Sequence, residues 1–201
     1  MAECYNHPGT ETDLNCSVCN QPICSGCQSF ANGNPVCPAC REQIVQELQQ
    51  ETQNPNIAGA VGLAVAAAIV SAVAWDKITF YSGYKLGLVA VIIGVLTGYA
   101  AYYGAGRKRG RAVQIVGAAT AVLGILFGEY LLLSDAISAK LNVSFSPFSP
   151  GYARLFFTGY LPSLDALDYV FAAIGLYEGF KIPQAKQIKL TEARSVTGAA
   201  G

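Results

Sequence analysis

The sequence predicts a small metal-binding module followed by an all-α membrane domain of four spans. All seven cysteines and the single histidine lie within residues 4–40, and neither residue type occurs after residue 40. Long uncharged apolar runs begin only at Ile57. Hydrophobic residues make up 52% of the chain and its formal net charge is zero, but these averages combine two parts of different classes.

The expected metal ligands come in four pairs, each with two intervening residues: Cys4/His7, Cys16/Cys19, Cys24/Cys27 and Cys37/Cys40. Two side chains at this spacing in a tight turn converge on one tetrahedral ion, so eight ligands fill two sites. Such sites leave no position open for water, and we therefore expect two structural zinc ions. A disulfide framework is the alternative for dense cysteines, but an odd number of cysteines in C-x-x-C pairs favours metal.

The four residues between Cys19 and Cys24 allow either a sequential or an interleaved assignment of pairs to ions. The pattern C-x2-H-x8-C-x2-C-x4-C-x2-C-x9-C-x2-C over residues 4–40 resembles the B-box zinc finger. The resemblance implies a cross-braced fold, with one zinc ion held by Cys4, His7, Cys24 and Cys27 and the other by Cys16, Cys19, Cys37 and Cys40. RING-type ubiquitin ligases are also cross-braced, but the short x8 and x4 gaps fit the B-box better.

The charge of the module limits its partners. Residues 1–52 contain one basic residue, Arg41, against six acidic residues. Proteins that bind nucleic acids need a basic face, so we expect a cytosolic protein partner or a structural role. The single histidine, His7, is committed to metal, which leaves no histidine for a nucleophilic catalytic site, and no enzymatic activity is expected. The N-terminus lacks the basic and apolar stretches of a signal peptide, which predicts a cytosolic module.

Residues 42–56 are expected to form a helical linker. Ile44, Val45 and Leu48 fall on one face of the predicted helix. This face either covers the small core of the zinc module or provides a docking or dimerising surface. The helix is expected to end at residues 54–56, Asn-Pro-Asn, before the first membrane span.

Four membrane spans are predicted, at residues 57–75, 86–106, 112–134 and 164–182. The fourth is the weakest, because its uncharged centre is only nine residues long. Basic residues at positions 107–111 and in the tail, residues 183–201, place both segments in the cytosol. Only an even number of spans places both termini there, which favours the fourth span. The loop around Asp76-Lys77 and the segment 135–162 would then lie on the outer side.

Parts of the membrane domain, residues 75–88 and 164–172, resemble uncharacterised bacterial four-span membrane proteins, some of which also have an N-terminal zinc finger. The resemblance implies a multi-pass protein of the bacterial cell membrane and no particular activity. Small residues also recur at spacing four, which brings helix backbones together either within one bundle or between copies of a homo-oligomer. These groups are Ala58/Gly62/Ala66, Ala90/Gly94/Gly98, Gly117/Ala121 and Gly124/Gly128.

Two functions remain open at this stage. The first is a membrane-anchored zinc-binding interaction protein, an adaptor or regulator without catalytic activity. The second is a small transporter or channel component that uses Glu129, because an acidic residue within a span often marks an ion path. Glu129 could instead form a structural pair with Lys85.

Overall fold

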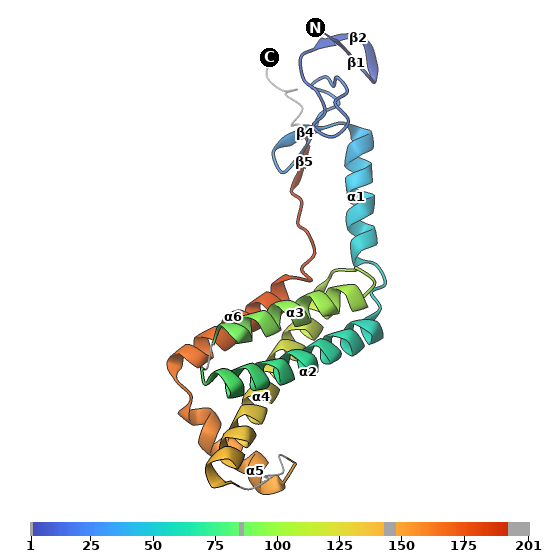
Figure 1. Ribbon diagram of the computed structural model, residues 1–201. Coiled ribbons are helices and arrows are strands. Elements are labelled where there is room, and N and C mark those ends of the chain that lie inside the picture. The colour runs from blue at the N-terminus through green and yellow to red at the C-terminus, as the bar shows by residue number, and fades with distance from the viewer. Residues whose placement is uncertain (1, 85–86, 143–147, 193–201) are drawn as a thin grey trace, which may run out of the picture. The chain divides into compact units, whose positions relative to one another are not determined.

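The computed structural model describes residues 2–84, 87–142 and 148–192, and the chain forms two compact units (Figure 1). One unit comprises Met1–Glu51 together with Lys186–Gly201, and the other comprises Thr52–Ala185. Residues 186–192, which belong to the predicted cytosolic tail, therefore lie in the same unit as residues 2–51.

The first unit contains two small antiparallel sheets. Strands β1 (Ala2–Cys4) and β2 (His7–Thr12) form one sheet, and the other has the strand order β4-β3-β5. Its strands are β3 (Ser29–Ala31), β4 (Asn34–Val36) and β5 (Leu190–Glu192). Asn32 and Gly33 form the two-residue turn between β3 and β4 with φ of 50° and 87°. This turn requires positive φ at both positions, which explains the Asn-Gly pair.

Helix α1 (Pro38–Thr52) is the only helix described in this unit. It begins with a proline, which suits the first helical turn because an N–H there has no intrahelical acceptor. The predicted linker helix is therefore present, but it begins within the last ligand pair, and Cys40 lies in its first turn. Ile44 packs against the buried cysteines. This contact supports the interpretation that the apolar face of α1 covers the core of the module.

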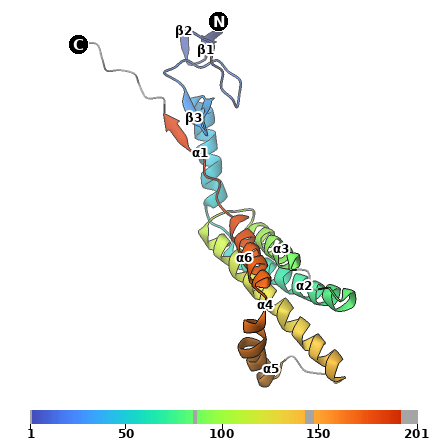
Figure 2. The same cartoon turned by 90° about the vertical axis from the view of Figure 1, so that its left-hand side faces the viewer.

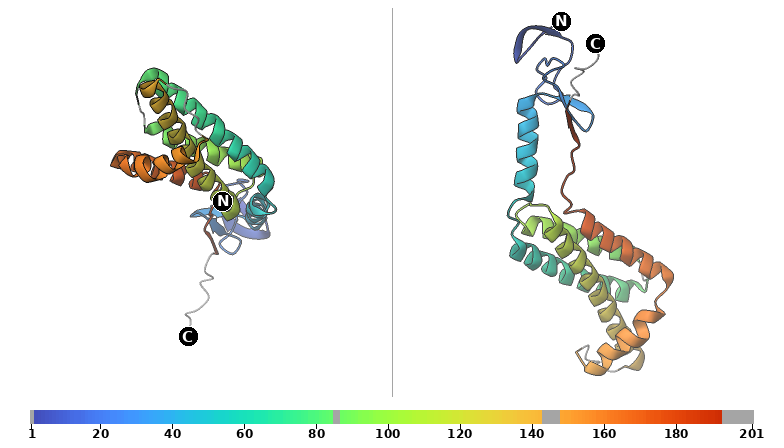
Figure 3. Two further views of the ribbon diagram at one scale, coloured as in Figure 1. Left: turned by 90° about the horizontal axis from the view of Figure 1, so that it is seen from below. Right: turned by 180° about the vertical axis from the view of Figure 1, so that it is seen from behind.

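The second unit is helical. Its long helices are α2 (Ile57–Ser82), α3 (Leu88–Gly104), α4 (Arg111–Leu141) and α6 (Ala166–Lys181). Helices α3 and α4 pack against each other and against both α2 and α6 (Figures 2 and 3). Between α4 and α6 lie α5 (Pro150–Leu155), a π-helical turn (Phe156–Tyr160) and a 3₁₀ turn (Leu161–Ser163). Helices α2 and α4 are long and apolar enough to cross a membrane, and α3 is a shorter apolar helix.

The helices extend beyond two of the predicted spans. Helix α2 continues to Ser82, so the loop predicted around Asp76-Lys77 is wrong. The Lys77 Nζ lies 2.9 Å from Asp76 Oδ2 and 2.7 Å from Asp135 Oδ2, and the second contact joins α2 to α4. Helix α4 likewise continues past residue 134 to Leu141. These charged residues are accommodated within the helices because they pair with one another.

Small residues bring the helices of this unit into close contact. A Cβ atom added at Gly94 of α3 would lie 2.0 Å from the carbonyl oxygen of Gly175 in α6, and one added at Gly117 of α4 would lie 2.4 Å from that of Gly179. A Cβ atom at Gly124 would likewise lie 3.1 Å from Ala68 Cβ of α2. Three of the predicted small-residue groups thus pack within the chain. The group on α2 does not pack within the chain: Ala58, Gly62 and Ala66 are exposed, and the buried stripe of this helix is Ala60, Ala64, Ala68 and Ala72.

Candidate metal centre

The predicted ligands form two separate clusters in the first unit. Cys4, His7, Cys24 and Cys27 make the first cluster, and Cys16, Cys19, Cys37 and Cys40 make the second. Within each cluster all four ligand atoms lie within 4.8 Å of one another. The pairs therefore interleave along the chain, as the B-box resemblance implies, and the sequential assignment does not hold.

Tight turns bring the two members of each pair together. In the first cluster the Cys27 N–H donates to the Cys24 carbonyl over 3.0 Å. The second cluster has a similar turn after its first pair, where the Asn20 N–H donates to the Cys16 carbonyl over 2.9 Å. Asn20 has a φ of 59°, a conformation that asparagine tolerates better than most residues. These turns give a structural reason for the two-residue gaps.

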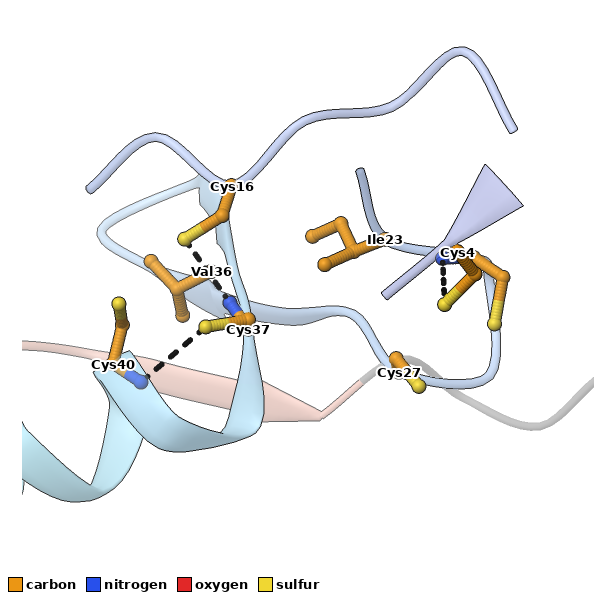
Figure 4. Close-up of a cluster of buried hydrophobic side chains, with 8 residues drawn as sticks. Cys4, Cys16, Ile23, Cys27, Val36, Cys37 and Cys40 are labelled. Atoms are coloured by element: carbon orange, nitrogen blue, oxygen red, sulfur yellow. Dashed lines mark hydrogen bonds between the residues drawn. The ribbon is translucent and has the colours of Figure 1, made fainter. Parts of the chain in front are cut away.

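Backbone contacts between the segments hold the interleaved arrangement. The Tyr5 N–H donates a hydrogen bond to the Pro22 carbonyl, and the Ile23 N–H donates one to the Leu14 carbonyl. Ile23 is fully buried and lies between the two groups of cysteines (Figure 4). Val36 is the other buried core residue that is not a cysteine.

The spacing of the ligand atoms fits tetrahedral ions. With metal–sulfur bonds of about 2.3 Å, two sulfur ligands of one tetrahedral ion lie about 3.8 Å apart. Cys19 Sγ and Cys37 Sγ are 3.8 Å apart. In the first cluster, His7 Nδ1 lies 3.1 Å from Cys27 Sγ, 3.5 Å from Cys24 Sγ and 4.0 Å from Cys4 Sγ. His7 thus turns its Nδ1 towards the three sulfurs, and Cys₃His and Cys₄ donor sets can each hold one ion.

Backbone N–H groups point at the sulfurs in the same way in both clusters. The Cys24 N–H donates to Cys4 Sγ over 3.2 Å, and the Cys37 N–H donates to Cys16 Sγ over 3.3 Å. In each cluster, therefore, the third ligand in sequence stabilises the first. Such bonds favour the thiolate form, which is the form that binds metal.

The pKa values of the cysteines depend on their burial and on the neighbouring groups of the same cluster. Burial raises the pKa of Cys4, but hydrogen bonds from the backbone of Cys24 and Asn6 and from the side chains of Cys24 and His7 together lower it to about 6. Burial, together with the side chains of Cys24 and Cys4, raises the pKa of Cys27 to about 11. The pKa of Cys40 is raised for the same kind of reason, by burial and by Cys37 and Cys19. Several thiolates within one cluster repel each other, and a bound divalent cation would remove this repulsion.

All seven cysteines are free in the structure. This finding contradicts the disulfide alternative. Six of the cysteines are buried, whereas Cys19 and His7 are exposed, so each cluster has one exposed ligand at the second position. Because most of the ligands are buried in the small core of the unit, the arrangement suits a role in holding the fold.

Glu129 in α4 was the other predicted site residue. Its proposed partner, Lys85, lies outside the described residues. Glu129 is buried, and its Oε2 accepts a hydrogen bond of 2.8 Å from the Tyr160 hydroxyl. It lines a cavity of about 150 Å³ together with Asp168. The Tyr160 hydroxyl thus gives the buried carboxylate of Glu129 a hydrogen-bond donor within the helical unit.

Sequence reasoning missed the contribution of the C-terminal segment to the first unit. The Asn32 N–H donates to the Lys189 carbonyl over 3.0 Å, which begins the pairing of β3 with β5. The available signal was a short polar–apolar alternation at residues 187–191, where Ile188 and Leu190 alternate with polar residues.

Comparison with protein-family models, curated proteins and solved structures finds no match for the chain.

Proposed function

We propose that this chain is a membrane-anchored zinc-binding interaction protein without catalytic activity, in which a B-box-like module contacts a cytosolic protein. The observation that carries the proposal is the pair of interleaved four-ligand clusters, which together use every cysteine and the only histidine. This leaves no thiol or imidazole for nucleophilic chemistry. The module is accordingly a structural platform for binding.

Zinc is the proposed ion in both clusters. Sulfur-rich sets of four ligands select Zn²⁺ among the common divalent cations, and closed tetrahedral sites are typical of structural zinc. Cytosolic thiols remain reduced and free to bind metal, which agrees with the free cysteines. Cys4, His7, Cys24 and Cys27 would hold one ion, and Cys16, Cys19, Cys37 and Cys40 the other.

The helical unit is the proposed membrane anchor. In the most apolar 18-residue stretch of α2 only 28% is buried, and in that of α4 only 39%. A core helix of a soluble protein is, by contrast, mostly buried. The outward faces carry large apolar side chains, among them Val70 at 70% exposure and Leu123 at 60%. Buried hydroxyls are satisfied within their own helices, as where Thr97 donates to the Ile93 carbonyl over 2.9 Å. Lipid is the medium that suits such a surface.

The strand pairing supports an even number of membrane crossings. Strand β5 follows the helical unit and pairs with β3, which precedes it, so residues on both sides of that unit share one compartment. We assign the crossings to α2, α3, α4 and α6, a four-helix transmembrane bundle with both termini in the cytosol. A reporter active only in the cytosol should therefore be active when fused to either terminus. Activity at one terminus alone would contradict this topology.

The surface charge indicates the kind of partner. Six acidic residues and one basic residue lie in residues 1–52, and bound thiolates add negative charge. Such a surface repels nucleic acid and attracts basic protein segments. The module is therefore proposed to bind a basic region of a cytosolic protein.

A quantitative pull-down tests the proposal. Full-length protein purified from membranes in mild detergent should recover a specific partner, and Cys24→Ser should lose it, because this substitution removes one ligand of the first cluster. Ser25→Ala is the matched control, because Ser25 is the exposed neighbour of Cys24 and is not in either cluster. Equal recovery by wild type and Cys24→Ser would contradict a role for the module, and recovery of the chain in the soluble fraction would contradict the membrane anchor.

A further inference from the structure

The outer edge of β3 carries a strand that comes from a distant part of the sequence. Lys189, just before β5, lies 157 residues after Asn32, which follows β3. The register pairs Phe30 with Thr191 and Ala31 with Leu190. Without β5, this edge would present the unpaired N–H and C=O groups of β3, which form a template for another strand.

Asn32 fixes the register of the docked strand with two hydrogen bonds. Its N–H donates to the Lys189 carbonyl, and its Oδ1 accepts from the Lys189 N–H, each over 3.0 Å. The side-chain amide thus takes the place of a backbone carbonyl at the end of the ladder. Asn32 also has the positive φ that the β3–β4 turn requires, so one residue serves both the hairpin and the edge.

The side chains of the docked segment alternate. Ile188 and Leu190 are half-buried, whereas Gln187, Lys189 and Thr191 are exposed. Lys186, just upstream, forms an ion pair of 3.2 Å with Glu51 of α1. The segment therefore meets the module through one apolar face, the backbone of β3 and a positive charge, and the acidic module provides the complementary charge.

The edge depends on both metal clusters. Strand β3 and its partner β4 lie between Cys27 of the first cluster and Cys37 of the second. The hairpin is therefore anchored at one end by each cluster. Loss of either ion would release one end of the hairpin and with it the edge.

We propose that the outer edge of β3 is a strand-docking site for a basic, extended peptide of a partner protein, and that residues 186–192 of the chain occupy it as an intramolecular competitor. This inference rests on the proposed function and specifies its partner class. Addition of a strand gives affinity through the backbone, while the half-buried positions and the charge give selectivity. A tethered segment acts at an effective concentration in the millimolar range, so a free peptide competes poorly until the tail is displaced.

Peptide binding to the purified protein in detergent tests the proposal. The probe is a fluorescently labelled peptide with the sequence of residues 184–192, QAKQIKLTE, measured by fluorescence anisotropy. A chain that ends at residue 185 should bind the probe at least about tenfold more tightly than the full-length chain, because its edge is free. A scrambled peptide should bind neither chain.

Two pairs of variants separate docking from folding. Asn32 and Lys189 exchange hydrogen bonds, so the alternation of an antiparallel ladder makes Phe30 and Thr191 the next bonded pair. In the full-length chain Thr191→Pro removes that N–H and should open the edge to the probe, whereas Thr191→Ala should not. In the shortened chain Asn32→Gly keeps the turn but removes the acceptor and should weaken probe binding, whereas Asn32→Asp should retain it.

The metal content of each preparation shows whether the module is folded. Suppose that both preparations hold two ions per chain and are therefore folded. Equal affinity of the shortened and full-length chains for the probe would then overturn the inference and leave the proposed function intact. A dimer that dissociates on removal of the tail would also overturn it, because the tail would then dock onto a second copy. A preparation without metal in which the probe still binds would overturn both.

Discussion

Removal of metal from the purified protein is expected to unfold the first unit and to leave the helical unit intact. Of the eight residues in the buried core of the first unit, only Ile23 and Val36 are not cysteines. A core of this size does not offset the conformational entropy of about 50 residues. A structural zinc ion contributes on the order of 10 kcal/mol per site, so the two proposed ions would provide most of the folding energy. The helices of the second unit contain none of the ligands.

Hydrogen–deuterium exchange on the full-length chain in detergent is the measurement. A chelator should abolish protection in β3, β4 and the first turn of α1, and also in β5, while protection in α2 and α4 stays unchanged. Metal analysis should give two ions per chain before chelation and none after it. Protection that persists in β3 without metal would show that the hydrophobic contacts suffice to fold the module.

Single ligand substitutions extend this test. Cys16→Ser should reduce the metal content to one ion per chain or less, because it removes a buried ligand that also accepts the Cys37 N–H. Ser17→Ala, at the neighbouring exposed position, should keep two ions, at the loss of one hydrogen bond from its hydroxyl to the Pro35 carbonyl. Two ions retained in Cys16→Ser would exclude Cys16 as a ligand.

Local spacing explains why the ligands were predictable and the sheet was not. A two-residue gap in a tight turn is a local constraint, so the four pairs could be identified from the sequence. The interleaving depends on longer loops, for which spacing left two assignments and only the B-box resemblance favoured one. Strand β5 has only three residues, and its partner β3 is distant in the sequence. Leu190 of β5 pairs with Ala31, which lies 159 positions earlier. A strand this short carries too weak a periodicity to predict that partner.

The errors in the helical unit have two physical causes. An uncharged run measures apolar length, but a helix can continue through charged residues. Helix α2 continues through Lys77, which pairs with Asp76 and Asp135. Helix α2 also contains so many alanines and glycines that spacing four occurs on more than one face. Sequence alone could not distinguish the buried stripe that includes Ala64 from the exposed one that includes Gly62.

A methyl group at Gly94 is expected to destabilise the helical unit strongly, whereas the same group at Gly62 is not. The Cβ of an alanine at position 94 would lie 2.0 Å from the Gly175 carbonyl oxygen, which is backbone and cannot rotate away. Helices α3 and α6 would have to separate, and overpacking of this kind costs about 1–3 kcal/mol. At Gly62 the added Cβ would meet nothing within 4 Å apart from the adjoining backbone of its own helix, and alanine favours helix by up to about 1 kcal/mol.

Thermal unfolding in detergent, followed by circular dichroism of the helices, compares the two variants directly. Gly94→Ala should lower the apparent melting temperature, and Gly62→Ala should leave it unchanged or raise it slightly. Gly175→Ala should behave like Gly94→Ala, because its Cβ would lie 2.4 Å from the Ala90 carbonyl oxygen on the facing helix. Because the chemical change is the same at all three positions, helix propensity cannot produce this difference. Equal melting temperatures for Gly94→Ala and Gly62→Ala would show that α3 and α6 are not in backbone contact, and the four-helix arrangement proposed for the membrane would then lose a contact that joins α6 to the other helices.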